Sequence, residues 1–299
     1  MPHLPEDLPF TIHQRRIDQG VGYVALLLPG LLLALTLVTG TCFYATLSHF
    51  YFSRIGGDLF VGTLIFIGLM LTFFYGAQPA GRDGVLAHRP ADLWLVRAAG
   101  LCALLIAFLP TTGSGCAYGA GQGARVFLGA AQGSEGFLPP DAAITGRLTH
   151  DFWASFASFG APEAVPSALA SLHFAAAAVM FAILGYFSLA VFTRHNSVAA
   201  RSAAEPGSRK ALRNRWYRGL GIAIYAAAGA VAAKFALTAW ILPEPVALGF
   251  GAVWDGWRVT FLLETVALMC FGLSWLIKGR FIAAFEDEAM LAPDQRREA

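Results

Sequence analysis

Three ionisable residues lie inside long apolar stretches of the sequence, where a charge is costly. They are His173, Lys234 and Glu264, and each is surrounded mainly by Ala, Leu, Val and Phe. A charged side chain inside a bilayer costs about 2.5 to 3.5 kcal/mol or more, so such residues usually pair or line a cavity. Imidazole, ammonium and carboxylate groups can form hydrogen bonds and ion pairs, and two of the three can bind metals. The pattern predicts a polar site in an apolar protein.

The three residues are expected at similar depths below one membrane face. With a rise of about 1.5 Å per residue, Glu264 lies about 8 Å from the outer end of its apolar run. By the same count, His173 lies about 9 Å and Lys234 about 12 Å from the outer ends of theirs. Three neighbouring helices would therefore offer polar groups at comparable depth.

The segment SHFYFSRIGGD joins the first two apolar runs and could close over the same place. It contributes a histidine, an arginine and an aspartate near the water boundary. A pocket that opens to the periplasm or cell exterior and binds a lipid or another small amphipathic molecule would use all of these groups. The predicted ligand-binding residues are His49, Arg54, Asp58, His173, Lys234 and Glu264.

Each of these residues also has a purely structural interpretation. Lys234 and Glu264 could form an ion pair that holds two helices together within the membrane. His173 could be an interior histidine that only forms hydrogen bonds. The polar residues of the joining segment could simply be solvated at the boundary.

A metal-dependent enzyme is an alternative from a different functional class. His49 and His173, with Asp58 or Glu264, would supply the two imidazoles and one carboxylate of a zinc site with an open position for water. The protein would then be a membrane hydrolase acting on a lipid head group. No HExxH or HxxxH spacing supports this site. A noncatalytic subunit of a membrane assembly is the third hypothesis.

Composition places the chain among integral membrane proteins. Of its 299 residues, 57% are hydrophobic and only 13% are charged, and the mean hydropathy is +0.58. These values are too apolar for a soluble domain of this length. The net charge is only +2, and no continuous basic face is present, so we expect no nucleic-acid partner.

Six uninterrupted apolar runs predict six transmembrane helices, because about 18 or more such residues are needed to cross a bilayer. Short connections make sequential helices antiparallel. The predicted fold is thus an all-α antiparallel bundle that forms a single domain over residues 1–299, with a kink at Pro29-Gly30. The predicted helices cover residues 21–47, 59–77, 93–111, 167–193, 217–242 and 259–278.

Lysine and arginine residues concentrate on one side of this arrangement, and the positive-inside rule makes that side cytoplasmic. The N-terminal segment 1–20 and the C-terminal tail 279–299 are then both cytoplasmic, and the protein lies in a bacterial inner membrane. The connections 48–58, 112–166 and 243–258 are expected outside. The only lysine or arginine residues in these outer connections are Arg54, Arg125, Arg147 and Arg258.

The connection 112–166 is too long to be a simple loop. Its first half is rich in glycine but follows no strand, so it is not expected to bind phosphate. Its second half predicts an amphipathic helix that lies on the outer membrane surface, in contact with lipids or a membrane-protein partner. The apolar residues at helical spacing are Ile144, Leu148, Phe152, Phe156 and Phe159.

A family resemblance rests on the segments SHFYFSRIGGDLFVG, LHFAAAAVMFAILGYFSLAVFTR and FLLETVALMCFGLSWLIKG, joined by the weaker RNRWYRGLG. Together they resemble an uncharacterised family of bacterial six-helix integral membrane proteins. The most distinctive part runs from Ser274 to Gly279. The resemblance implies an integral membrane fold but no activity, and the long connection 112–166 is unusual for the family.

Overall fold

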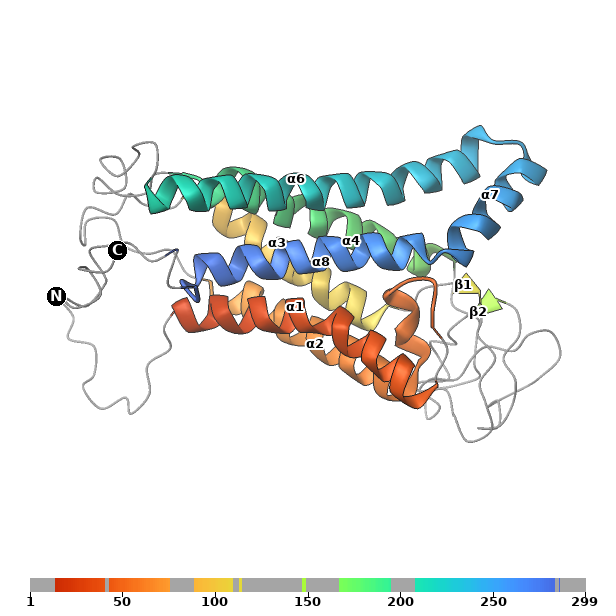
Figure 1. Cartoon of the computed structure of the whole chain (residues 1–299), viewed down its shortest axis with the longest axis horizontal. Coiled ribbons are helices and arrows are strands. Elements are labelled where there is room, and N and C mark those ends of the chain that lie inside the picture. The colour runs from red at the N-terminus through yellow and green to blue at the C-terminus, as the bar shows by residue number, and fades with distance from the viewer. Residues whose placement is uncertain are drawn as a thin grey trace.

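The computed structural model describes residues 14–40, 43–75, 89–109, 113–114, 147–148, 167–194, 208–282 and 285. Within this part of the chain, six helices are long and apolar enough to cross a membrane, and they pack side by side as one bundle (Figure 1). The predicted all-α six-helix membrane fold is confirmed. The helices are α1 (Gln14–Thr39), α2 (Arg54–Phe73), α3 (Pro90–Phe108), α4 (Ser167–Tyr186), α6 (Arg209–Ala236) and α8 (Val259–Lys278).

Shorter elements extend or connect these helices. A π-helical turn continues α4 and another continues α6, while a 3-10 helix precedes α2 and a separate helix lies between α6 and α8. These elements are η1 (Ser48–Phe52), η3 (Phe187–Val191), η4 (Leu237–Ile241) and α7 (Glu244–Gly256). Two strands of two residues each, β1 (Gly113–Ser114) and β2 (Arg147–Leu148), pair antiparallel.

The start of α1 and the end of α8 lie together, at what we call the terminus end of the bundle (Figure 1). Two side chains of α1 bind the carbonyl oxygen of Gly279, because Arg15 Nε donates to it over 2.9 Å and Gln19 Nε2 over 2.8 Å. The opposite end carries η1, α7 and the strands, and we call it the loop end. An even number of spans places both ends of the described chain on one side.

Glycine pairs allow the closest helix contacts. A Cβ atom at Gly272 of α8 would lie 2.8 Å from the carbonyl oxygen of Gly22 in α1. A Cβ at Gly100 of α3 would likewise lie 2.8 Å from the carbonyl oxygen of Gly68 in α2. Because lipid provides no hydrophobic drive between helices, small residues that permit backbone contact stabilise their association. These two glycine pairs therefore fix the α1–α8 and α2–α3 contacts.

Three predicted helix starts are too late by five residues or more. The first helix begins at Gln14 rather than at residue 21, the second at Arg54 rather than 59, and the fifth, α6, at Arg209 rather than 217. Asp18 therefore belongs to α1 and not to a tail. A buried carboxylate is tolerated there because it is paired with Lys278, over 2.9 Å.

The connection 243–258, predicted as a loop, is mostly the helix α7. Pro243 precedes the helix, and Pro245 lies in its first turn, where the missing N–H costs no hydrogen bond. Glu244 lies in the same turn, where its negative charge interacts favourably with the positive end of the helix dipole. Figure 1 shows α7 returning from the far end of α6 across the loop end to the start of α8.

The predicted surface helix in the connection 112–166 is wrong at Arg147–Leu148. These two residues form β2, which pairs with Gly113–Ser114, so their backbone groups bond to another segment instead of a helical turn. Ile144, Phe152, Phe156 and Phe159 lie outside the described residues.

Candidate functional site at the loop end

The segment Phe43–Ser53, between α1 and α2, packs into the loop end of the bundle. Its aromatic residues account for this position. Tyr44 and Phe50 are only 1% and 0% exposed, and their ring centroids lie 5.0 Å apart. Phe43 packs edge to face on Phe261 of α8, with centroids 4.8 Å apart. Burial of such rings is strongly favourable, so the segment covers polar groups beneath it.

Glu264 of α8 binds this covering segment. Its Oε2 accepts a hydrogen bond of 2.7 Å from the backbone N–H of Leu47. One turn earlier, the N–H of Phe261 donates to the carbonyl oxygen of Ala45 over 3.0 Å, which satisfies a donor at the start of α8. Among the described residues Glu264 forms no ion pair. A single N–H bond to one carboxylate oxygen leaves the other oxygen to be satisfied from elsewhere.

His173 of α4 binds the same segment and is completely buried, with 0% exposure. Its Nδ1 lies 2.8 Å from the carbonyl oxygen of Leu109, and its Nε2 lies 3.1 Å from Oγ of Ser48. A carbonyl can only accept, so Nδ1 donates and Nε2 accepts from the serine hydroxyl. Both ring nitrogens are thereby used, as in the purely structural interpretation of this residue.

The structure thus brings together two of the three predicted intramembrane residues. Glu264 and His173 do not contact each other directly, but they bind adjacent residues, Leu47 and Ser48, of one segment. That segment contains part of the SHFYFSRIGGD motif, which was predicted to close over this place.

Lys234 is not part of this site, and the predicted Lys234–Glu264 ion pair is wrong. Its Nζ lies 3.7 Å from Oδ1 of Asp255 in α7. Both partners are partly exposed, with 25% exposure for the lysine side chain and 42% for the aspartate. The pair therefore joins α6 to α7 at the surface.

The predicted depth of Lys234 fails because α6 is longer than the membrane is thick. With η4 it spans 33 residues, or about 50 Å, against a hydrocarbon core of about 30 Å. Tyr217 of α6 and Trp275 of α8 both pack on the ring of Phe192, so they lie at the same height along the bundle. Lys234 lies about 25 Å beyond Tyr217, and Val259 lies about 24 Å from Trp275. Lys234 is therefore level with the loop end of α8.

The remaining candidates lie in or beside the covering segment. His49 is buried, with 6% exposure, and its ring packs edge to face on Tyr44, with centroids 6.5 Å apart. Asp58, in the second turn of α2, is exposed. The side chain of Arg54 lies outside the described part of the structure.

The predicted zinc site is not formed. Among the described residues, no group of three or more His, Cys, Asp or Glu side chains is placed to hold a metal ion. The physical reason is clearest at His173, where Ser48 takes the nitrogen lone pair that a metal would need. His49, Asp58 and Glu264 do not converge with it to complete a ligand set.

A buried polar network at the terminus end was missed from the sequence. Both carboxylate oxygens of Asp18 lie 2.9 Å from Nζ of Lys278. Tyr75 donates its hydroxyl proton to Asp18 and accepts from Nε1 of Trp275 over 2.6 Å. Burial, and then the charge of Asp18, raises the pKa of Tyr75 well above its ordinary value, so this phenol stays protonated. The network joins α1 and α8 to Tyr75, two residues after the end of α2.

A second ion pair at the terminus end joins α3 to Arg194, which follows η3. Asp92, 4% exposed, is paired with Arg194, whose Nη2 also donates to the hydroxyl oxygen of Tyr186 over 2.6 Å. Asp92 lies in the first turn of α3, where the helix dipole favours a carboxylate. Asp18 and Asp92 each lie at the boundary of an apolar run, and this position is the sequence signal that could have marked them as buried. A single sequence does not reveal their partners.

Comparison with other proteins adds no relative to these observations. No family model matches the chain, and neither a curated protein nor a solved structure matches it.

Proposed function

We propose that this multi-pass membrane protein binds a lipid or another small amphipathic molecule at the loop end, with Glu264 as the polar anchor. The observation that carries the proposal is the incomplete bonding of this carboxylate. It lies in a membrane-spanning helix, accepts one backbone N–H and has no cationic partner among the described residues. Carboxylates in membranes are costly and typically mark functional sites.

The neighbouring residue strengthens this argument. The hydroxyl oxygen of Thr265 is buried and has no hydrogen-bond partner within the described structure. Buried polar groups are nearly always bonded, so this hydroxyl is a second group in the same turn of α8 that an additional molecule could satisfy. Because a carboxylate accepts hydrogen bonds, the ligand would present a hydroxyl, amine or amide donor to it.

The covering segment bounds the site on one side. Polar bonds from Ala45, Leu47 and Ser48 hold it to α8 and α4. A net hydrogen bond to a charged group contributes about 1.5 to 3 kcal/mol. A ligand donor could therefore replace the N–H of Leu47 at Glu264, or bond to the second carboxylate oxygen, while the buried rings of Tyr44 and Phe50 keep the segment packed.

Glu264→Gln should lower ligand occupancy at least fivefold. The amide keeps the size of the side chain but loses the charge that strengthens the hydrogen bond to a donor. Native mass spectrometry of protein purified from membranes measures the amphipathic molecules that remain bound. Glu244→Gln is the matched control, because Glu244 is an exposed carboxylate at the start of α7. If Glu264→Gln lowers only thermal stability and keeps the bound molecules, Glu264 has a structural role.

We further propose that the terminus end faces the cytoplasm of a bacterial inner membrane, as the distribution of lysine and arginine favours. A reporter that is active only in the cytoplasm should be active when fused at Arg209 and inactive when fused at Glu135. Expression levels of the two fusions provide the control. Activity at Glu135 would reverse the orientation.

A further inference from the structure

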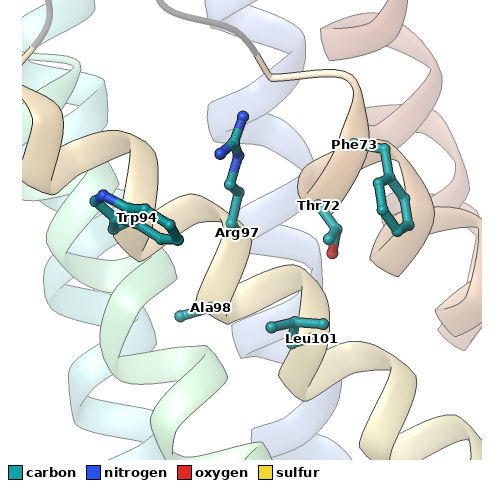
Figure 2. A pocket seen from close by; sticks show the side chains of 6 residues that line it. All are labelled: Thr72, Phe73, Trp94, Arg97, Ala98 and Leu101. Atoms are coloured by element: carbon teal, nitrogen blue, oxygen red, sulfur yellow. The ribbon is translucent and has the colours of Figure 1, made fainter.

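We propose that a groove between α2 and α3 at the terminus end binds the phosphate group of an anionic phospholipid. This site is separate from the loop-end site and does not depend on it. The groove encloses about 410 Å³. Figure 2 shows the side chain of Arg97 standing between Trp94 on its own helix and Thr72 on α2. The lining residues are Thr72, Phe73, Trp94, Arg97, Ala98 and Leu101.

Arg97 brings a positive charge that the described protein does not neutralise. It lies about 10 Å along α3 from Pro90, within a membrane-spanning helix. Its described contact is with the ring of Trp94, 5.8 Å from the guanidinium carbon. Its Nε is buried and has no hydrogen-bond partner among the described residues. In contrast to Arg194, which is paired with Asp92, Arg97 keeps its donors for an anion from outside.

Thr72 supplies a second donor at the same groove. Its Oγ1 is also buried without a hydrogen-bond partner in the described structure. In membrane helices a threonine hydroxyl commonly bonds to the carbonyl four residues earlier, so a hydroxyl whose donor is unused is uncommon. The space that it occupies depends on Gly100, because a Cβ there would collide with it. The α2–α3 glycine contact thus sets Thr72 in the groove that Arg97 also lines.

The walls of the groove favour a lipid over a soluble anion. Phe73 and Trp94 are each 68% exposed, and Leu101 is 52% exposed, although all three belong to the membrane-spanning helices α2 and α3. These apolar surfaces fit acyl chains. An arginine near a helix end directs its guanidinium toward the head groups, where it can bind phosphate oxygens through two parallel N–H bonds. A phospholipid would place its phosphodiester at the polar groups of Arg97 and Thr72 and an acyl chain along the apolar side chain of Leu101.

The test is a titration of delipidated protein with phosphatidylglycerol, measured by native mass spectrometry. Arg97→Gln should weaken the tightest binding event at least fivefold, and Thr72→Val about twofold to threefold, because it removes one neutral donor. Arg218→Gln should leave that event unchanged. Arg218 is the matched control, since it is an exposed arginine at a similar distance from the start of α6. Phosphatidylcholine, which is zwitterionic, should bind at least fivefold more weakly to wild type.

Two results would overturn the proposal. Equal weakening by Arg97→Gln and Arg218→Gln would show a general effect of basic charge. Displacement of phosphatidylglycerol by millimolar inorganic phosphate would assign the groove to a soluble anion instead. Melting temperatures of all variants without added phospholipid separate loss of binding from loss of fold, and Thr72→Val, which conserves volume, tests the site even if Arg97→Gln is poorly folded.

Discussion

Replacing Gly272 with leucine should lower the melting temperature of the protein by about 6 to 12 °C. A Cβ atom at this position would lie 2.8 Å from both the carbonyl oxygen of Gly22 and the backbone nitrogen of Leu26. Backbone cannot move aside as a flexible side chain can, so α1 and α8 must separate. Overpacking of this kind costs about 3 kcal/mol, and each kcal/mol lowers the melting temperature by about 2 to 4 °C in proteins of 150–250 residues.

Gly229→Leu is the matched control, because it makes the same change in another membrane helix. A Cβ at Gly229 of α6 would meet no atom within 4 Å. Leucine also favours a helix by nearly 1 kcal/mol relative to glycine, so this variant should melt at or above the wild-type temperature. Thermal unfolding in detergent, followed by size-exclusion chromatography, compares the two. Equal melting temperatures for both variants would refute the close α1–α8 contact.

Lys278→Met should cost about 3 kcal/mol of stability. Asp18, the partner of this lysine, has a side chain that is only 4% exposed. Removal of one partner from a buried ion pair typically costs about 3 to 5 kcal/mol, because it leaves the other charge buried and uncompensated. The lower end applies here, since Tyr75 and Gln14 still donate hydrogen bonds to Asp18.

Lys234→Met is the control for this prediction. Its partner Asp255 is 42% exposed, and the two charged atoms are 3.7 Å apart. Exposed pairs of this kind contribute about 0 to 1 kcal/mol, so the change should be small. In the double variant Asp18→Asn with Lys278→Met, the uncompensated charge is gone, and more than half of the lost stability should return. A double variant no more stable than Lys278→Met would exclude a charge effect.

The sequence determined the class of fold because membrane helices need continuous apolarity. In lipid, a spanning segment must satisfy its backbone polar groups internally, so a run of about 20 apolar residues specifies a helix almost without reference to its neighbours. The six spanning helices follow from this local rule. Bacterial family, inner membrane and cytoplasmic termini stay predictions.

The same rule failed where polar residues belong to helices. The start of α1 was placed too late because Asp18 interrupts the apolar run, and only Lys278, 260 residues away, explains its burial. The depth of Lys234 was misjudged because hydropathy does not show where a helix leaves the membrane. In α6 and η4 the apolar residues continue past the level at which α8 begins, and Trp240 is 77% exposed there.

The candidate site was predictable in part. A histidine and a glutamate in apolar helices must be satisfied by something. Ser48, the first residue of the segment that the sequence places over the site, bonds to His173, whereas Glu264 bonds to Leu47, which precedes that segment. The sequence did not show that the partners are a backbone N–H and a serine hydroxyl, because backbone groups are the same at every position. Which N–H reaches Glu264 is decided by how Tyr44 and Phe50 pack the covering segment against α8.

The identity of the ionisable residues and the presence of six membrane helices were thus determined locally, by residue type and by the cost of charge and unpaired backbone in lipid. Only the tertiary structure decided their partners. It paired Lys234 with Asp255 and Lys278 with Asp18, and left Arg97 beside a groove. The physical reason is that ion pairs act over a few ångströms, and those distances depend on the glycine contacts and helix lengths that set how the helices pack.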